Sequence, residues 1–249
     1  MNKEDKYIVD VLAFGAHPDD VELGAGGTVA KLTKKGKKVA FVDLTKGESG
    51  SRGTAQQRVK ESKKAAEILR VSFRENLGMP DTKLQVNEES EKAIVKCIRK
   101  YRPKAALLNA GFERHPDHET AHRLVRSAMF KSGLLKYETE FEGKAQQRHR
   151  IRKMFSYLQA YEFPEKASFY VDVSDSFEDK MNSIKAYSSQ VFVPGESDPD
   201  GPVTRLSRPE FLEEIESRSI YFGALIGVRY AEAFLSVEPI ALDNLSLLL

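Results

Sequence analysis

The chain of 249 residues is poor in cysteine, in net charge and in long apolar stretches. Its single cysteine, Cys97, excludes an internal disulfide framework and fits a reducing compartment, and its helical-looking surroundings predict a small packed hydrophobe. The 39 Lys and Arg nearly balance the 37 Asp and Glu, so the net charge of +2 gives no electrostatic argument for nucleic acid or a membrane surface as a partner. No stretch is long and apolar enough for a secretory signal or a membrane span, and we expect a cytoplasmic protein.

Short apolar runs rich in β-formers alternate with helical patterns through the first half of the chain. We expect buried strands at residues 8–15, 39–44, 73–77 and 105–109, and helices at residues 21–35, 55–70 and 88–101. Thr54 and Asn87 are the expected N-caps of the second and third helices. This βαβα rhythm predicts an α/β fold with a Rossmann-like, mostly parallel sheet and flanking helices.

The second half of the chain is less regular. We expect strands at residues 153–161 and 169–173, a helix from Ser174 to about residue 188, and a helix at residues 209–223 that begins on Pro209. The stretch PGESDPDGP, residues 194–202, is typical of a surface loop, with a lid as the alternative. The length fits a single domain, with a Rossmann-like core over about residues 1–135 and a C-terminal part over about residues 136–249.

Two clusters of ionisable residues follow predicted strands. AFGAHPDD, residues 13–20, ends the first strand, and ERHPDHETAH, residues 113–122, follows the fourth. Ligands of open α/β sheets bind at the carboxyl ends of the strands, where the strand order reverses, and in the order 3-2-1-4 the first and fourth strands are neighbours there. The two clusters should therefore face each other. Their residues are His17, Asp19, Asp20, His115, Asp117 and His118.

Two imidazoles and a carboxylate from separate loops match a catalytic zinc site, which has three protein ligands and an open position for water. The clusters leave a further carboxylate and histidine, as a hydrolytic site needs for its general base and its oxyanion donor. Either cluster alone could be a capped helix start, so the pairing of the two favours a metal. His118 and His122 could instead bind as a pair on one helix face, which would leave His115 without a role. His149 is expected to be a solvated surface residue.

The glycines of LGAGGT, residues 23–28, do not fit a dinucleotide-binding fingerprint. The turn directly after the first strand is residues 15–18, and Asp20 occupies the position of the third glycine. Asp43, at the end of the second strand, does mimic a ribose-binding acid, so a non-catalytic sugar- or nucleotide-binding protein stays as an alternative. Gly26 and Gly27 are expected to let the first helix approach the sheet closely.

Six motifs in order resemble one family, the zinc-dependent de-N-acetylases of N-acetylglucosamine conjugates (LmbE/PIG-L-like), related to the deacetylases of glycosylphosphatidylinositol and mycothiol synthesis. They are AHPDDVELGAGGT, VDLTKGESGSRGT, NLGMPD, ERHPDH, AYSSQVF and GVRYAEAF. The chain is most similar to the bacillithiol branch. The resemblance implies hydrolysis of the N-acetyl group of N-acetylglucosaminyl-malate, with a chitooligosaccharide as the alternative substrate. It also implies one Zn²⁺ per chain, with Fe²⁺ as the alternative, and a homo-oligomer, a trimer or hexamer.

The resemblance also assigns roles in catalysis. The implied metal ligands are His17, Asp20 and His118. Asp19 would be the general base, and His115 would polarise the amide carbonyl and stabilise the tetrahedral intermediate. Asp117 would hold the imidazole of His115 in the useful orientation.

The implied substrate contacts lie in the loops around the two clusters. The sugar contacts fall on Glu48, Arg52 and Asp81, and Arg114 resembles a position that meets the carboxylate of the aglycone. Two departures from the family are visible. Glu113 stands where some relatives have a tyrosine, so a tyrosine donor to the oxyanion is not expected there, and the loop reads GESGSRG in place of GELGTRG.

Overall fold

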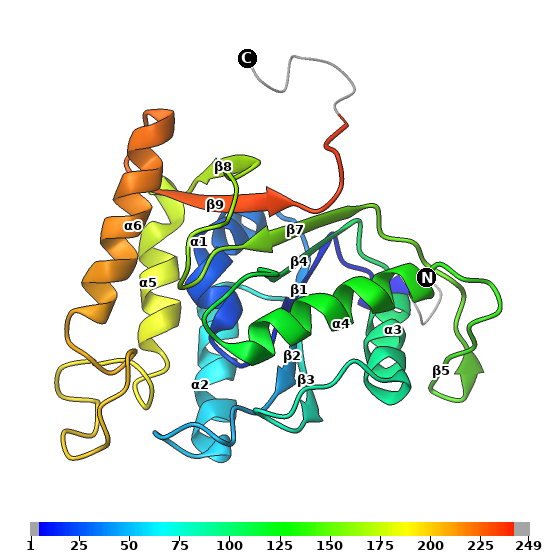
Figure 1. Ribbon diagram of the computed structural model, residues 1–249, viewed down its shortest axis with the longest axis horizontal. Coiled ribbons are helices and arrows are strands. Elements are labelled where there is room, and N and C mark those ends of the chain that lie inside the picture. Colours follow the sequence, from blue (N-terminus) through cyan, green and yellow to red (C-terminus); the bar gives the residue numbers. More distant parts are fainter. Residues whose placement is uncertain (1–4, 242–249) are drawn as a thin grey trace.

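A computed structural model describes residues 5–241 of the chain. Its centre is a seven-stranded sheet of order β3-β2-β1-β4-β7-β9-β8 (Figure 1). The strands are β1 (Val11–Gly15), β2 (Val39–Thr45), β3 (Phe73–Met79), β4 (Ala105–Asn109), β7 (Lys153–Tyr157), β8 (Phe169–Asp172) and β9 (Ala231–Ser236). The first five are parallel, and β9 is antiparallel to both β7 and β8. The predicted α/β fold and the order 3-2-1-4 are confirmed.

Helices cover both faces of the sheet (Figure 1). They are α1 (Asp20–Lys34), α2 (Ala55–Ile68), α3 (Glu88–Tyr101), α4 (Pro116–Ser132), α5 (Phe177–Lys185) and α6 (Phe211–Ile226). α5 packs against α1 and α2 on one side, and α3 packs against α4 on the other. A two-stranded ribbon of β5 (Glu140–Phe141) and β6 (Lys144–Ala145) lies apart from the main sheet. Within residues 5–241, no helix has the length and apolar character needed to cross a membrane.

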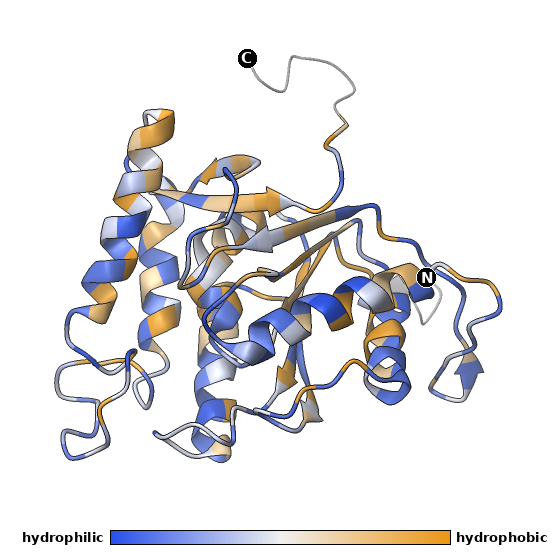
Figure 2. Cartoon of the chain, viewed as in Figure 1, coloured by the Kyte–Doolittle hydropathy of each residue, from blue (hydrophilic) through white to orange (hydrophobic). Residues whose placement is uncertain are grey.

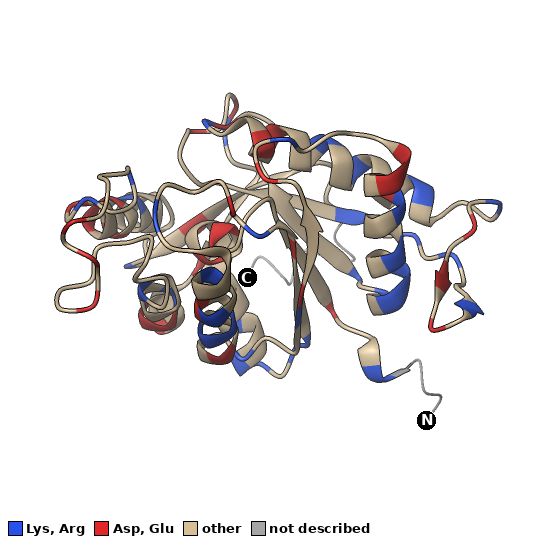
Figure 3. Cartoon of the chain, turned by 90° about the horizontal axis from the view of Figure 1, so that it is seen from below, with Lys and Arg blue, Asp and Glu red and all other residues tan. Residues whose placement is uncertain are grey.

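The strand residues alternate between two hydrophobic cores. Leu12 and Phe14 pack in the core beneath α3 and α4, whereas Val11 and Ala13 pack in the core beneath α1. Because both faces are covered, the central strands are almost continuously apolar, as Figure 2 shows. The helices carry charges of both signs, in keeping with the small net charge (Figure 3).

Several predicted boundaries were wrong. The first strand begins at Val11 instead of residue 8, and the strand expected to reach residue 161 ends at Tyr157. The helix expected from Ser174 is a 3-10 turn followed by α5, which ends at Lys185. Helix α4 and strand β9 were not predicted as elements.

Helix α6 passes through the glycine that was expected to end it. A Cβ on Gly223 would lie 2.6 Å from the carbonyl oxygen of Val228, so this glycine allows the chain after the helix to pack closely. The helix ends three residues later, where Gly227 has a φ of 75° and supplies the left-handed cap.

The close approach of α1 to the sheet depends on Gly24. A Cβ there would lie 2.2 Å from Cδ2 of the Tyr157 ring on β7. A Cβ on Gly26 or Gly27 would instead meet Lys180 or Val173, outside the strands. The expected approach to the sheet is nevertheless seen at Gly27, whose N–H donates to Glu232 on β9 at 2.9 Å, whereas Gly26 faces α5.

Candidate active site

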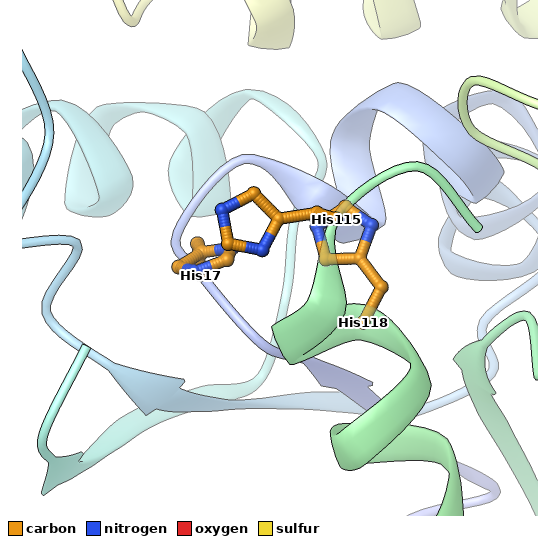
Figure 4. Close-up of side chains that lie close together, drawn as sticks. All are labelled: His17, His115 and His118. Atoms are coloured by element: carbon orange, nitrogen blue, oxygen red, sulfur yellow. The ribbon is translucent and has the colours of Figure 1, made fainter. Parts of the chain in front are cut away.

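The loops after β1 and β4 bring the two predicted clusters together. Asn109, the last residue of β4, ties the loops because its Oδ1 accepts a hydrogen bond from the Ala16 N–H at 3.1 Å. Figure 4 shows the three imidazoles of the clusters side by side. The centroid of the His17 ring lies 4.7 Å from that of His115 and 5.4 Å from that of His118. The rings of His115 and His118 stack with their centroids 5.1 Å apart.

The donor set of the cluster fits a divalent metal. Ligand atoms of the three histidines lie within 4.8 Å of one another. Asp20 lies between two of them, with Oδ2 3.7 Å from Nδ1 of His17 and Oδ1 3.2 Å from Nε2 of His118. Among the described residues, the buried Nδ1 of His118 has no hydrogen-bond partner. Three imidazoles and a carboxylate whose nitrogen and oxygen atoms converge in a buried pocket are the donor set of a divalent metal site.

The charges of the cluster depend on one another. Burial lowers the pKa of His17, but hydrogen bonds to Asp117, Asp20 and Asp81 outweigh burial and raise that pKa well above its usual value. Burial also opposes ionisation of Asp20, yet the attraction of His118 and His17 holds the pKa of this carboxyl well below its usual range. The cluster therefore keeps a carboxylate ionised inside the protein, as a cation site requires.

Asp19 has both the backbone and the surroundings of a functional carboxylate. It precedes α1 with a φ of 104°, a strained conformation for a residue other than glycine. Burial raises the pKa of Asp19 to about 7, against the opposing attraction of Arg58. Nη2 of Arg58 lies 3.1 Å from its Oδ2. A carboxyl group that titrates near neutral pH suits a general base.

Two amide side chains that the sequence analysis did not identify hold Asp20. Nδ2 of Asn109 donates to Oδ2 at 3.1 Å, and Nε2 of Gln159 donates to Oδ1 at 2.9 Å. The position of Asn109 at the end of a predicted strand could have identified it as a site residue from the sequence. Gln159 lies 139 residues from Asp20 with no motif around it, so only the fold reveals it.

A cavity of about 380 Å³ opens over the cluster. Seven of the residues predicted to bind metal or substrate or to act in catalysis line it: His17, Asp19, Asp20, Asp81, Arg114, His115 and His118. Leu23, Phe211 and Ile215 add apolar wall, and Arg205 and Arg218 add positive charge. The cavity has room for a small ligand and combines apolar walls with a few polar groups.

Two of the implied sugar contacts do not line this cavity. The Arg52 guanidinium donates to the carbonyl oxygens of Asp198, Pro202 and Ser189 at 2.6, 3.0 and 3.3 Å, so it holds the loop of residues 194–202. Glu48 accepts the backbone N–H of Asp81 at 2.9 Å and so supports a lining residue. The Arg52 guanidinium is therefore bonded to loop carbonyls, and the Glu48 carboxylate is bonded to a backbone amide.

Asp117 contacts a different histidine from the one expected. Its Oδ2 accepts the N–H of Thr82 at 2.7 Å and lies 3.5 Å from Nε2 of His17. Nδ1 of His115 instead accepts the backbone N–H of Asp117 at 3.2 Å, because His115 is the N-cap of α4. The main chain therefore orients the imidazole of His115.

Other candidate residues have structural partners. Asp43 binds the guanidinium of Arg74 through two hydrogen bonds of 2.8 Å, which leaves no free acid for a ribose. His122 contacts the carbonyl oxygen of Asn109 at 2.9 Å and is outside the cluster. The expectation for His149 was wrong: it is half-buried, with Nε2 2.7 Å from the carbonyl oxygen of Pro103.

Several known proteins that resemble this chain are deacetylases. The family model described as GlcNAc-PI de-N-acetylase (PIG-L) matches residues 12–129. The chain is 32% identical to a diacetylchitobiose deacetylase of Thermococcus kodakarensis over 97% of this chain and 88% of the relative. It is 29% identical to a probable N-acetyl-α-D-glucosaminyl L-malate deacetylase 2 of Bacillus anthracis over 48% of this chain and 58% of the relative.

Solved structures extend the likeness over the whole fold. The crystal structure of the conserved protein TT1542 from Thermus thermophilus superposes with a TM-score of 0.83 at 33% identity, over 96% of this chain and 99% of that one. The sequence match to a curated deacetylase likewise spans nearly all of the chain, including both histidine clusters. The chain therefore belongs to the PIG-L family of GlcNAc de-N-acetylases and is an N-deacetylase.

Proposed function

We propose that this enzyme hydrolyses the N-acetyl group of N-acetylglucosaminyl-malate and releases acetate and the free amine. The observation that carries the deacetylase chemistry is the group of three histidines and two adjacent carboxylates at one cavity. Two arginines on the cavity, Arg114 and Arg218, form no ion pair with a described residue, and this favours an anionic conjugate. The malate deacetylase of Bacillus anthracis supports the same substrate.

The ligands we propose for the metal are His17, Asp20 and His118. These residues would hold a zinc ion, which would supply Lewis-acid chemistry: a lowered pKa for water, towards about 7, and polarisation of the amide carbonyl. Asn109 and Gln159 fix the Asp20 carboxylate through their amide groups, so the site is held in place before any ligand enters.

The remaining groups act on the proton and on the developing charge. Asp19, with a pKa near 7, takes the proton of the attacking water. His115, partly exposed at the cavity, donates to the oxygen of the tetrahedral intermediate, an interaction of roughly 3–4 kcal/mol. The amine leaves with a proton from Asp19 or His115. Asp81 and Arg114 stay as proposed substrate contacts, whereas the contacts of Arg52 and Glu48 give those residues supporting roles.

A diacetylated chitobiose is the second candidate substrate. The Thermococcus deacetylase named for it matches nearly the whole chain. Both candidates present a 2-acetamido sugar, so the same cluster would act on either. They differ in the charge of the group attached to the sugar.

Deacetylation rates measured side by side test the proposal. The substrates are N-acetylglucosaminyl-malate, N,N′-diacetylchitobiose and free N-acetylglucosamine, each with the zinc-loaded enzyme. We expect the largest kcat/KM for the malate conjugate. A larger value for the chitobiose would select the second candidate, and no turnover of any of the three would contradict the proposed substrate class.

We also propose a homo-oligomer, a trimer or hexamer. Large apolar side chains are exposed on the C-terminal half of α6, where Ile220, Tyr221 and Leu225 are 48, 56 and 52% exposed. Light scattering after size exclusion gives the assembly mass, and a monomer would contradict this proposal. A cytoplasmic location stays a prediction from the single cysteine.

A further inference from the structure

The arginines near the active site differ in how well the protein itself satisfies them. Arg74 has two carboxylate partners, Asp43 and Glu22. Arg58 has the Asp19 carboxylate and two backbone carbonyls. Such partners are the usual requirement for a guanidinium inside a protein.

Arg218 on α6 is the exception among the arginines of the cavity that are not exposed. Its five N–H groups have one hydrogen-bond acceptor among residues 5–241, the backbone carbonyl of Gln159. It forms no ion pair with any described residue. The side chain is half-buried and lines the active-site cavity. Burial, together with the positive charge of nearby Arg205, lowers the pKa of Arg218 to about 10.

The nearest acids are committed to other partners. The Glu113 carboxylate accepts three backbone N–H groups, from Arg114, Ala160 and Tyr161, at 2.7, 3.0 and 3.1 Å. Glu214 is shared by two other arginines, Arg205 and Arg208. Positive charge on this wall of the cavity therefore exceeds what the local carboxylates balance.

The position of Arg218 connects this charge to the reacting centre. Gln159 accepts from Arg218 through its backbone carbonyl and donates to Asp20 through its side chain. Gln159 alone would therefore link an anion bound to Arg218 with Asp20, a proposed metal ligand. Leu23, Phe211 and Ile215 line the same cavity, and apolar walls strengthen an ion pair by excluding water.

We propose that Arg218, assisted by Arg205, is the subsite that binds a carboxylate of the substrate's aglycone. A planar guanidinium with free N–H groups can hold a carboxylate through two parallel hydrogen bonds. This subsite would select anionic N-acetylglucosamine conjugates over neutral ones. The inference rests on the proposed deacetylase function and adds the residues that set its substrate preference.

Kinetics on an anionic and a neutral substrate test this assignment. Arg218→Gln should lower kcat/KM for N-acetylglucosaminyl-malate by roughly 10- to 100-fold, mainly through KM, and change that for N,N′-diacetylchitobiose by less than about threefold. Arg218→Lys keeps the charge and should recover part of the loss, and Arg205→Ala should show a smaller loss of the same selectivity. The matched control is Arg123→Ala, which removes an exposed arginine that does not line the cavity and should leave both rates unchanged.

Equal losses of Arg218→Gln on both substrates would overturn the proposal, because they would mean that Arg218 acts only by supporting Gln159 and Asp20. Binding of malate itself can be measured independently of any turnover of the malate conjugate. Calorimetry with malate alone should show binding to the zinc-loaded wild type that Arg218→Gln weakens about tenfold or more. Wild-type binding without deacetylation of the conjugate would refute the proposed substrate but keep the subsite, whereas no malate binding would overturn the subsite.

Acetate, a carboxylate that the reaction itself releases, tests whether Arg218 binds the product instead of the aglycone. Its inhibition of diacetylchitobiose deacetylation should be unchanged in Arg218→Gln. If that variant weakens acetate and malate equally, the guanidinium holds the product's carboxylate and the aglycone assignment is wrong.

Discussion

Two polar clusters at the start of α1 are built from similar residues and have different roles. The cavity cluster contains Asp19 and Asp20, and the neighbouring buried cluster contains Glu22, Asp43, Arg74 and Tyr187. In the buried cluster Arg74 contacts Asp43 at 2.8 Å and Glu22 at 2.6 Å, and Tyr187 donates to Glu22 at 2.9 Å. The two carboxylates share the single guanidinium of Arg74, and among the described residues the buried Oε2 of Glu22 has no hydrogen-bond partner.

The cavity cluster leaves groups available to a ligand. Its carboxylates and imidazoles lie within reach of one another, the Nδ1 of His118 has no partner among the described residues, and the cluster opens to the cavity. The difference between the two clusters is access: charges enclosed by the fold and paired with one another can only stabilise it, whereas charges that line a cavity are available to a ligand. Substitutions in the two clusters should therefore have separable effects.

The largest effect is expected from Asp19→Asn. The amide cannot take a proton, so the deacetylation rate should fall by roughly two to four orders of magnitude, while the metal content and the far-ultraviolet circular dichroism stay unchanged. Rate and metal content measured on the same preparation check this. If Asp19→Asn loses the metal and Asp20→Asn keeps it, the two carboxylates have the opposite roles.

Arg74→Met tests the buried cluster. It leaves Asp43 and Glu22 without their cation, so the free energy of unfolding should fall by about 3–5 kcal/mol. Urea denaturation measures the change. The matched control is Lys104→Met, which breaks an exposed pair with Asp10 and should cost at most about 1 kcal/mol. Equal effects of the two substitutions would show that the buried cluster is not a stabilising unit.

A smaller effect is expected from Gly24→Ala, on the helix that carries both clusters. The new Cβ would meet the Tyr157 ring, whose hydroxyl is fixed by a 2.7 Å hydrogen bond to the Phe14 carbonyl, so we expect a loss of roughly 1–3 kcal/mol. Gly26→Ala is the control, because the nearest contacts of its Cβ are longer, 3.2 Å to Cγ of Lys180 and 3.6 Å to Oγ of Ser183, and the helix gains propensity. Thermal unfolding compares the two. A Gly24→Ala protein as stable as the wild type would mean that α1 can shift without cost.

The sequence alone predicted those parts of the fold and of the site that depend on local patterns. Strand–helix alternation and the positions of the two clusters predicted the strand order and the meeting of His17 with His118, because parallel strands present their carboxyl ends at one edge. The helix after His115 was missed, although Pro116 at its first turn is a start signal.

Contacts between distant segments could not be predicted in this way. Arg58 reaches Asp19 across 39 residues, and Arg218 reaches the Gln159 carbonyl across 59. No spacing rule encodes such contacts, which arise only once α2 and α6 have packed. The same holds for Arg52, which donates to the carbonyl oxygens of Asp198 and Pro202 across 146 and 150 residues.

The first turns of α1 and α4, 98 residues apart at Asp20 and His118, should together form one metal site. Elemental analysis of His118→Ala, alongside its deacetylase activity, tests this most directly, with His122→Ala as the control on the same helix. We predict about one divalent ion per chain in the wild type and in His122→Ala, and loss of both metal and activity in a folded His118→Ala protein. Full metal occupancy in His118→Ala, or loss of metal in His122→Ala alone, would contradict the account.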